Sequence, residues 1–346
     1  MASVALTVVK LSDLADGQEA DCFAALVRRV RGTTYKNEPF LKCYFRDSRS
    51  IVEAPLWSDH RLLKQAESWA DGNAYRLHVK AAIKPKYGLQ IDILDIRAAG
   101  PADEADGFDF RDLYESSKYP AAKLLHTIHD CIEKYIVDPF VRRLVRDLLA
   151  DHDELFRVIQ AATNFHHSYN GGLLEHVWSM TRISGFLADH YAKYYDGLNP
   201  PLNKGLIVAA AILHDLGKVR ELKYDPVEAK YTKQGSLIGH VLMGRDLVRE
   251  AAGRIDGFPE ETLLLLEHAI LAHHGKKEFG APIVPQTLEA LIVSFVDDLD
   301  AKVNIVAQEL RRSTTEGEFT DKIFAMEHRR IYKGIPRELP GVDESA

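Results

Sequence analysis

The sequence predicts a multidomain protein in which a small N-terminal β-barrel precedes an all-α domain. Residues 1–98 alternate apolar and polar side chains with the period of two that is typical of strands. From about Ala121 onward the apolar residues recur with a period of 3.6, which is typical of helices. The chain has 346 residues, too many for one ordinary hydrophobic core, and its apolar and charged fractions of 46% and 27% are those of a globular protein.

The barrel is predicted from five short strands that turn residues separate. A helix-like stretch at about 60–70 falls between the third and fourth strands, as in barrels of the oligonucleotide-binding (OB) type. The expected strands cover residues 21–31, 40–45, 51–57, 74–83 and 89–96.

The rest of the chain divides by composition into a linker, the helical domain and a tail. Residues 99–120 are acidic and contain Gly and Pro, so we expect an interdomain linker there. The helical domain is expected over residues 121–312, with Gly- and Pro-containing breaks between its helices. Residues 313–346 form a charged tail, for which we expect a short helix that folds back.

Composition and charge exclude several classes of protein. No run of 18 apolar residues is present, so no membrane-spanning helix is expected, and the N-terminus lacks the basic-then-apolar order of a signal peptide. The three cysteines are scattered, which predicts reduced thiols in a cytoplasmic protein. The net charge of −7 divides into +3 for residues 1–100 (15 basic, 12 acidic) and −10 for the remainder, so the predicted barrel is the more basic part.

Histidines and aspartates inside apolar stretches predict a metal site in the helical domain. His214 and Asp215 end the apolar run IVAAAILHD, and Gly217 marks the end of that helix. His176 and Asp297 also interrupt apolar helical stripes. Buried polar groups are costly unless they are paired or bind a metal, and His and Asp are ligands for Zn, Mn and Fe.

This pattern resembles the HD-domain metal-dependent phosphohydrolases. The resemblance rests on HDLGK (214–218), which follows an apolar helix, and on a late aspartate in another apolar helix. HHSYNGGLLEHVWSM, LAHHGKKEFGAP and LDAK are similar to the YhaM-type 3′-to-5′ exoribonucleases, which place an OB barrel before the HD domain.

The resemblance implies two divalent ions per chain that act on a phosphodiester. A first ion would be held by His176, His214, Asp215 and Asp297. Asp215 would bridge to a second ion held by His240, His273 and His274. The expected ion is Mn²⁺, with Zn²⁺, Fe²⁺, Co²⁺ and Mg²⁺ as alternatives. Asp215 and Lys218 are the expected catalytic residues, with Lys218 on a phosphate oxygen or, alternatively, a surface lysine at a helix end.

Several polar neighbours of this set have two interpretations each. His268, Asp298 and Asp300 either support the metal ligands or are satisfied elsewhere. His166 and His167 either line the RNA path or have only structural roles in capping and packing, and we favour the structural roles.

The barrel is expected to bind a single strand through stacked bases and paired phosphates. The preferred contact residues combine aromatic and basic side chains: Tyr44, Trp57, Lys42, Arg76 and Tyr87. The wider set adds Phe40, Tyr75, Arg28, Arg31, Lys36 and Lys86, and at least half of the aromatic residues should face the barrel core.

These observations predict a metal-dependent 3′-to-5′ exoribonuclease that releases nucleoside 5′-monophosphates from single-stranded RNA. Single-stranded DNA as a second substrate and a homo-oligomeric state are left open. One alternative is an HD phosphodiesterase of small or cyclic nucleotides, which would not need the barrel. Another is a nucleic-acid-binding protein with an inert HD domain, which the intact ligand set argues against.

Overall fold

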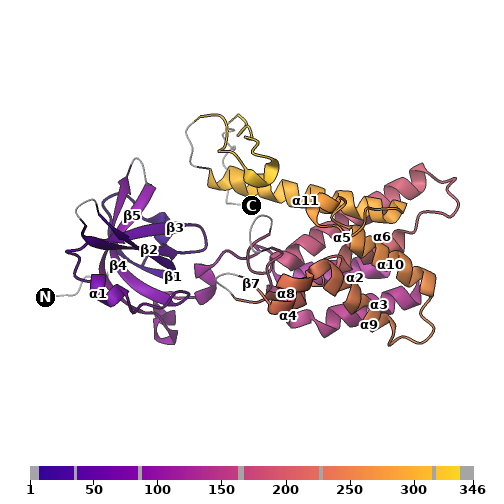
Figure 1. Cartoon of the computed structure of the whole chain (residues 1–346), viewed down its shortest axis with the longest axis horizontal. Helices are drawn as coiled ribbons and strands as arrows, with labels where there is room; N and C mark the ends of the chain where they lie inside the picture. Colours follow the sequence, from indigo (N-terminus) through magenta and orange to yellow (C-terminus); the bar gives the residue numbers. More distant parts are fainter. Residues whose placement is uncertain are drawn as a thin grey trace, which may run out of the picture. The chain divides into compact units, whose positions relative to one another are not determined.

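The computed structural model describes residues 8–34, 37–84, 88–162, 167–225, 229–313 and 317–335 (Figure 1). They form two compact units: the first contains the described residues up to Lys118 together with Asp225, and the second contains the remaining described residues from Tyr119 onward. In the described ranges, no helix is both long and apolar enough to cross a membrane.

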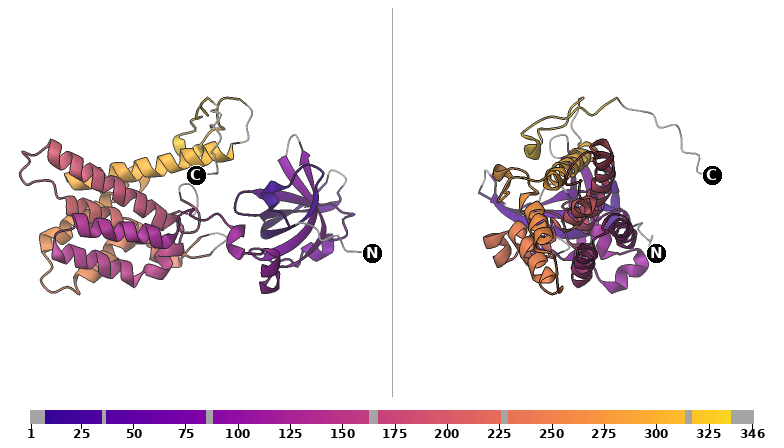
Figure 2. Two further views of the ribbon diagram at one scale, coloured as in Figure 1. Left: turned by 180° about the vertical axis from the view of Figure 1, so that it is seen from behind. Right: turned by 90° about the vertical axis from the view of Figure 1, so that its right-hand side faces the viewer.

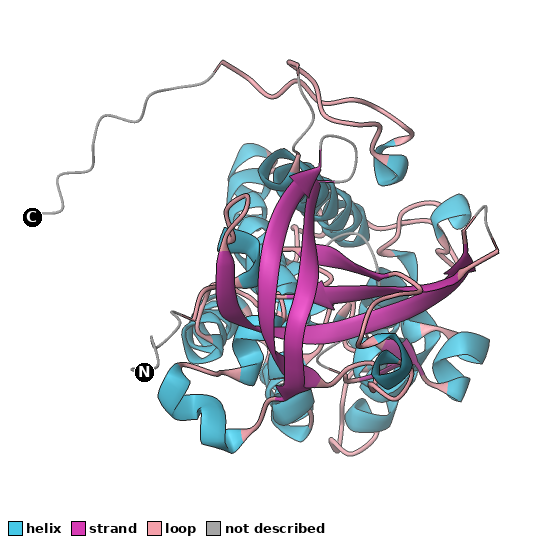
Figure 3. Ribbon diagram, turned by 90° about the vertical axis from the view of Figure 1, so that its left-hand side faces the viewer, coloured by secondary structure: helices cyan, strands magenta, loops and turns pink. Residues whose placement is uncertain are grey.

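The first unit is a closed five-stranded barrel (Figure 3). Its strands pair in the order β1-β2-β3-β5-β4, and the parallel β3–β5 pair closes the barrel. This order and the short helix α1 (Leu63–Ala66) between β3 and β4 confirm the predicted OB-type fold. The strands are β1 (Glu19–Thr33), β2 (Pro39–Arg46), β3 (Ile51–Leu56), β4 (Ala74–Lys84) and β5 (Gly88–Ala98).

Strict alternation along β2 separates the barrel core from its outer surface. Leu41, Cys43 and Phe45 are buried, whereas Lys42 and Tyr44 between them are only half-buried. The same period of two places one face of every strand in the core. Burial raises the pKa of the Cys43 thiol to about 12, which leaves it a protonated core residue.

The segment after β5 belongs to the barrel unit, which differs from the linker expected over residues 99–120. Two 3₁₀ turns, η2 (Pro101–Asp106) and η3 (Phe110–Leu113), carry it along the barrel. Leu113 and Tyr114 are buried against Phe23, so apolar burial holds the segment in place. Its acidic composition suggested a solvated connection, whereas its two ends are bound by packing and by ion pairs to β4 and β5.

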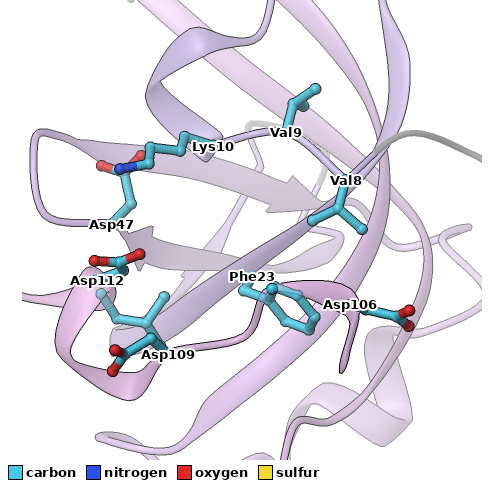
Figure 4. Close-up of a pocket in the computed structure, with 10 residues that line it drawn as sticks. Val8, Val9, Lys10, Phe23, Asp47, Asp106, Asp109 and Asp112 are labelled. Atoms are coloured by element: carbon cyan, nitrogen blue, oxygen red, sulfur yellow. The ribbon is translucent and has the colours of Figure 1, made fainter. Parts of the chain in front are cut away.

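A cavity of about 200 Å³ lies between this segment and β1 (Figure 4). Several aspartates line it, together with Val8, Phe23 and Leu113. Asp47 accepts hydrogen bonds from the backbone N–H groups of residues 12, 49 and 50, and Asp106 pairs with Arg76. These carboxylates therefore have structural roles in the barrel unit.

The second unit is helical and is built around α6 (Lys204–Leu213), which is buried along its length from Leu206 to Leu213. α5 (Gly172–Tyr194) and α11 (Leu288–Arg312) are its longest helices; both pack on α6 and lie side by side (Figures 1 and 2). The other helices are α2 (Ala121–Tyr135), α3 (Pro139–Asp151), α4 (Asp153–Val158), α7 (Lys218–Glu221), α8 (Lys233–Ile238), α9 (His240–Ala252) and α10 (Glu260–Ala272). A two-stranded ribbon joins β6 (Leu222–Lys223) to β7 (Lys230–Tyr231).

The described part of the tail differs from the predicted short helix. Isolated bridges join Phe319 to Tyr332 and Ile323 to Arg329, around the single 3₁₀ turn η5 (Phe324–Met326). Thr320 is fully buried and donates its hydroxyl to the carbonyl of Asp321, so local pairing organises this segment.

Candidate metal centre and nucleic-acid surface

His214 and Asp215 can both face the same site because they directly follow the last residue of α6. His214 keeps helical dihedral angles after the last α6 residue, and a turn then leads into α7. Gly217 has a φ of −58°, so it is not the left-handed helix end that the sequence suggested. A Cβ atom on Gly217 would lie 2.0 Å from the carbonyl oxygen of His240, so glycine is needed for the close approach of α9.

Four predicted ligands meet in the interior of the helical unit. His176 lies on α5, His214 and Asp215 directly follow α6, and Asp297 lies on α11. The His176 Nε2 atom lies 3.2 Å from both His214 Nε2 and Asp297 Oδ1. Asp215 Oδ2 is 3.4 Å from His214 Nε2. Ligand atoms about 2.1 Å from one ion are roughly 3.0–3.4 Å from one another, so this spacing fits a shared cation. We call His176, His214, Asp215 and Asp297 the inner cluster.

The other predicted ligands form an outer cluster of His240, His273 and His274, whose ligand atoms lie within 4.8 Å of one another. His240 begins α9, and the other two directly follow α10. The Oδ1 atom of Asp215 is 3.4 Å from His240 Nε2 and 3.7 Å from His273 Nε2. Asp215 therefore turns one carboxylate oxygen to each cluster.

Unpaired buried atoms support a cation at the outer cluster. Asp215 Oδ1, His240 Nε2, His273 Nε2 and His274 Nδ1 are buried and have no hydrogen-bond partner within the described parts of the chain. An unsatisfied buried polar atom costs about 1–3 kcal/mol, and four of them converge here. A divalent cation would satisfy all four, so the residues present fit such an ion.

Each cluster has a carboxylate that orients one of its histidines. Asp300 accepts a hydrogen bond from His176 Nδ1 at 2.7 Å, which leaves His176 Nε2 for the inner cluster. Glu221 on α7 accepts one from His240 Nδ1 at 3.0 Å and another from the His240 backbone N–H. The sequence analysis left Asp300 undecided and missed Glu221. The sequence carries no signal for Glu221, because its burial and its contact with His240 appear only in the structure.

Backbone carbonyls orient two further histidines. His214 Nδ1 donates to the carbonyl of Ala211 at 2.9 Å, and His273 Nδ1 donates to that of Ile270 at 2.6 Å. Both rings thereby keep Nε2 available toward the clusters.

Electrostatics favour ionised carboxylates and a neutral outer imidazole. Burial opposes ionisation of Asp215, but the charges of Lys218 and His214 outweigh it and hold its pKa well below the usual value. Burial, then the neighbouring His274, holds the pKa of His273 well below its ordinary value. A neutral imidazole and an ionised carboxylate are the forms that bind metals.

Lys218 is a buried lysine rather than a surface residue. Its Nζ donates to Asp215 Oδ2 at 2.5 Å, and the residue is only 6% exposed. It therefore brings a positive charge directly to the centre.

The remaining candidates lie around the clusters. His167 is buried, bonds through its Nε2 to Asp300 at 3.1 Å and so supports the inner cluster through that carboxylate. His268 accepts the backbone N–H of Gln286 and joins neither cluster. Asp298 pairs with Lys302 on the exposed side of α11. His166 lies outside the described residues.

The barrel presents a row of polar and aromatic side chains across β1, β2 and β3. Arg28, Tyr44 and Glu53 are cross-strand partners in register. The Arg28 guanidinium lies 4.6 Å from the centroid of the Tyr44 ring, and Tyr44 donates its hydroxyl to Glu53 at 3.1 Å. Lys42 also pairs with Glu53, at 3.1 Å.

An aromatic pair continues this surface along β2. Trp57 is 47% exposed and its ring centroid lies 5.3 Å from that of Phe40. Gly32 is the cross-strand partner of Phe40, and a Cβ there would lie 2.3 Å from the Phe40 ring. Glycine therefore lets the Phe40 ring cross β1.

Two predicted contact residues have other roles in the barrel unit. Arg76 pairs with Asp21, Asp103 and Asp106, so its charge is neutralised where it anchors the segment after β5. Tyr75 is buried among the core aromatic rings. Tyr87 and the lysines of the wider set, Lys36 and Lys86, lie outside the described residues.

Comparisons with known proteins agree with this arrangement. Residues 173–302 match the HD domain family. The 3′-5′ exoribonuclease YhaM of Bacillus subtilis (strain 168) is 33% identical over 318 residues, which cover 92% of this chain and 95% of that protein. YhaM of Bacillus pumilus (strain SAFR-032) is 33% identical over 321 residues, with coverage of 92% and 95%.

Among solved structures, an OB domain from Methanosarcina mazei aligns with 18% identity and a TM-score of 0.22. It covers 32% of this chain and 98% of that domain, and this likeness is too weak to add to the barrel topology itself. The two exoribonucleases instead match over nearly their whole length, including the HD domain. The chain therefore belongs to the YhaM family of 3′-5′ exoribonucleases.

Proposed function

We propose that this protein is a metal-dependent 3′-to-5′ exoribonuclease that releases nucleoside 5′-monophosphates from single-stranded RNA. The observation that carries the proposal is the carboxylate of Asp215, which turns one oxygen to each of two histidine clusters. We propose two Mn²⁺ ions, one at each cluster. When bound, such ions neutralise phosphate charge and lower the pKa of water.

The chain's own groups would position the scissile phosphate and balance its charge. Lys218 brings a buried cation to within 2.5 Å of Asp215 and would hold a phosphate oxygen there. Hydrolysis adds the oxygen of one water to phosphorus and breaks the P–O3′ bond. One proton of that water ends on the 3′ oxygen of the shortened RNA, and the terminal nucleotide leaves with its 5′ phosphate.

The barrel would hold the upstream RNA. Arg28, Tyr44 and Trp57 supply a cation and two aromatic faces on one surface, which is the combination that single-stranded nucleic acid needs. Nothing in that combination selects ribose, so single-stranded DNA is proposed as a second substrate.

The test uses a 5′-labelled 20-mer RNA and metal-stripped protein to which Mn²⁺, Zn²⁺, Fe²⁺, Co²⁺ or Mg²⁺ is restored. We expect fragments that shorten one nucleotide at a time from the 3′ end, with Mn²⁺ most effective, and nucleoside 5′-monophosphates as products. His214→Ala and Asp215→Ala should both strongly reduce this activity without loss of helical circular dichroism. Asp215→Ala should be the more damaging change because it removes a group shared by both clusters.

Two outcomes would contradict the proposal. Internal cleavage products would exclude an exonuclease. Full activity in Asp215→Ala at full metal content would exclude the shared carboxylate.

A further inference from the structure

A short loop returns the chain to the outer cluster immediately after His274. Gly275 adopts a φ of +72° and Gly280 a φ of +94°, so both ends of the loop use left-handed backbone. The N–H of Ala281 bonds to the carbonyl of Lys276 at 3.2 Å, which closes the loop on itself. A Cβ on Gly280 would lie 3.5 Å from His274 Nδ1, so the far end of the loop touches the ring of His274.

The loop displays an aromatic ring and two cations. Phe279 is 54% exposed, although it directly precedes the glycine that touches His274. The Nζ atom of Lys276 lies 5.4 Å from the centroid of the Phe279 ring, and Lys277 is exposed beside it. A single exposed phenylalanine is common in proteins. Packing does not explain an exposed ring that a closed loop holds beside the Lys276 cation and next to a glycine that touches a metal-ligand candidate.

We propose that the loop of residues 275–281 is a nucleotide subsite of this centre. In it, Phe279 stacks on a base close to the scissile phosphate, and the two lysines hold the adjoining backbone phosphates. The inference rests on the proposed function and deepens it, because it assigns the group that recognises the 3′ end of the RNA. Aromatic rings stack on any base, so the subsite would be tolerant of sequence.

The test combines a protein change with a substrate change. Phe279→Ala should raise KM for an unmodified RNA 20-mer by roughly 5- to 150-fold with little change in kcat, from the usual strength of a base–aromatic stack. Phe279→Trp should restore KM. Lys277→Ala should reduce by about one the slope of log affinity against log salt, measured by fluorescence anisotropy.

Substrates with one abasic nucleotide at each of the last three positions locate the stacked base. At that position the wild type should lose affinity, and Phe279→Ala should cause no further loss. The control is Phe324→Ala, which removes a ring from the tail that is even more exposed than Phe279 and should leave KM unchanged.

The proposal is overturned if Phe279→Ala leaves KM unchanged. It is also overturned if Phe279→Ala raises KM by the same factor on all three abasic substrates as on unmodified RNA. Failure of the wild type to shorten unmodified RNA from the 3′ end would instead refute the proposed function.

Discussion

Replacing Asp300 and Glu221 separately should weaken two different metal-binding events. Asp300 accepts hydrogen bonds from His176, His167 and Ser179, and both of its oxygens are used. In Asp300→Asn, the NH₂ group can face the Ser179 hydroxyl, which accepts as well as donates, so the remaining oxygen still accepts from His176 and His167 but without the negative charge. Weakening the hydrogen bonds to both histidines in this way corresponds to metal affinity about 10- to 100-fold lower at the inner cluster.

Glu221→Gln should have a smaller effect, confined to the outer cluster. Both hydrogen bonds from His240 end on the same oxygen, Oε1, which the glutamine side chain keeps. Only the negative charge is lost, so we expect metal binding at the outer cluster to be weaker by up to about 10-fold. The matched control for Asp300→Asn is Asp298→Asn, because Asp298 lies on α11 like Asp300 but pairs outward with Lys302.

The assay is calorimetric titration of metal-stripped protein with Mn²⁺, with thermal unfolding as a check on folding. The wild type should show a tighter phase from the inner cluster, which has two carboxylates, and a weaker phase from the outer cluster. Asp300→Asn should lower the metal affinity of the tighter phase, and Glu221→Gln should lower that of the weaker phase. The reasoning is refuted if both variants move the same phase, or if Asp300→Asn moves neither.

Two further predictions concern the barrel unit. Trp57→Ala should raise KM for an RNA 20-mer roughly 5- to 150-fold but leave dinucleotide cleavage unchanged, because a dinucleotide has no upstream nucleotides for the barrel to bind. An equal loss on both substrates would mean that Trp57 only supports folding. Asp103→Asn should lower the free energy of unfolding of the barrel by about 2 kcal/mol at neutral pH, because Asp103 is buried and hydrogen-bonded by Arg97. The Arg97 hydrogen bond holds the pKa of Asp103 below its ordinary value despite burial, so this stabilisation is complete above about pH 4 and is lost as the pH falls further. The gap between the urea unfolding curves of the two proteins should therefore narrow as the pH falls from 4 to 2.5, and a constant gap would show that the charge of Asp103 is not responsible.

Periodicity and residue type were enough to predict the barrel and the helical unit, whereas the full ligand set, with His240, His273 and His274, came from the resemblance to the HD family. The alternation along β2 follows from the pleat of a strand, which is a local property. The inner ligands were visible because polar residues such as His214 interrupt otherwise apolar helices, and a helix of this kind is buried wherever it lies.

Features that depend on contacts between distant segments were not predictable. In the sequence Gly217 looked like the residue that ends a helix. In the structure glycine is required there because the backbone of α9 leaves no space for a Cβ atom. Arg76 looked like a phosphate contact because the sequence does not show that Asp21 and Asp103 lie beside it. Glu221 lies on a one-turn helix with no periodic signal, and only the position of His240 gives it a role.

The two clusters differ in access, and this difference indicates where RNA must approach. Three of the four inner ligands, His176, His214 and Asp215, are almost completely buried, and only Asp297 keeps a small exposed fraction, so little of the inner cluster is open to a polymer. His240 and His274 are only partly buried, and His274 leads into the exposed loop of residues 275–281. A phosphodiester would therefore reach Asp215 from the outer cluster. The proposed nucleotide subsite lies on that side, so substrate recognition and the weaker metal site would share one entrance.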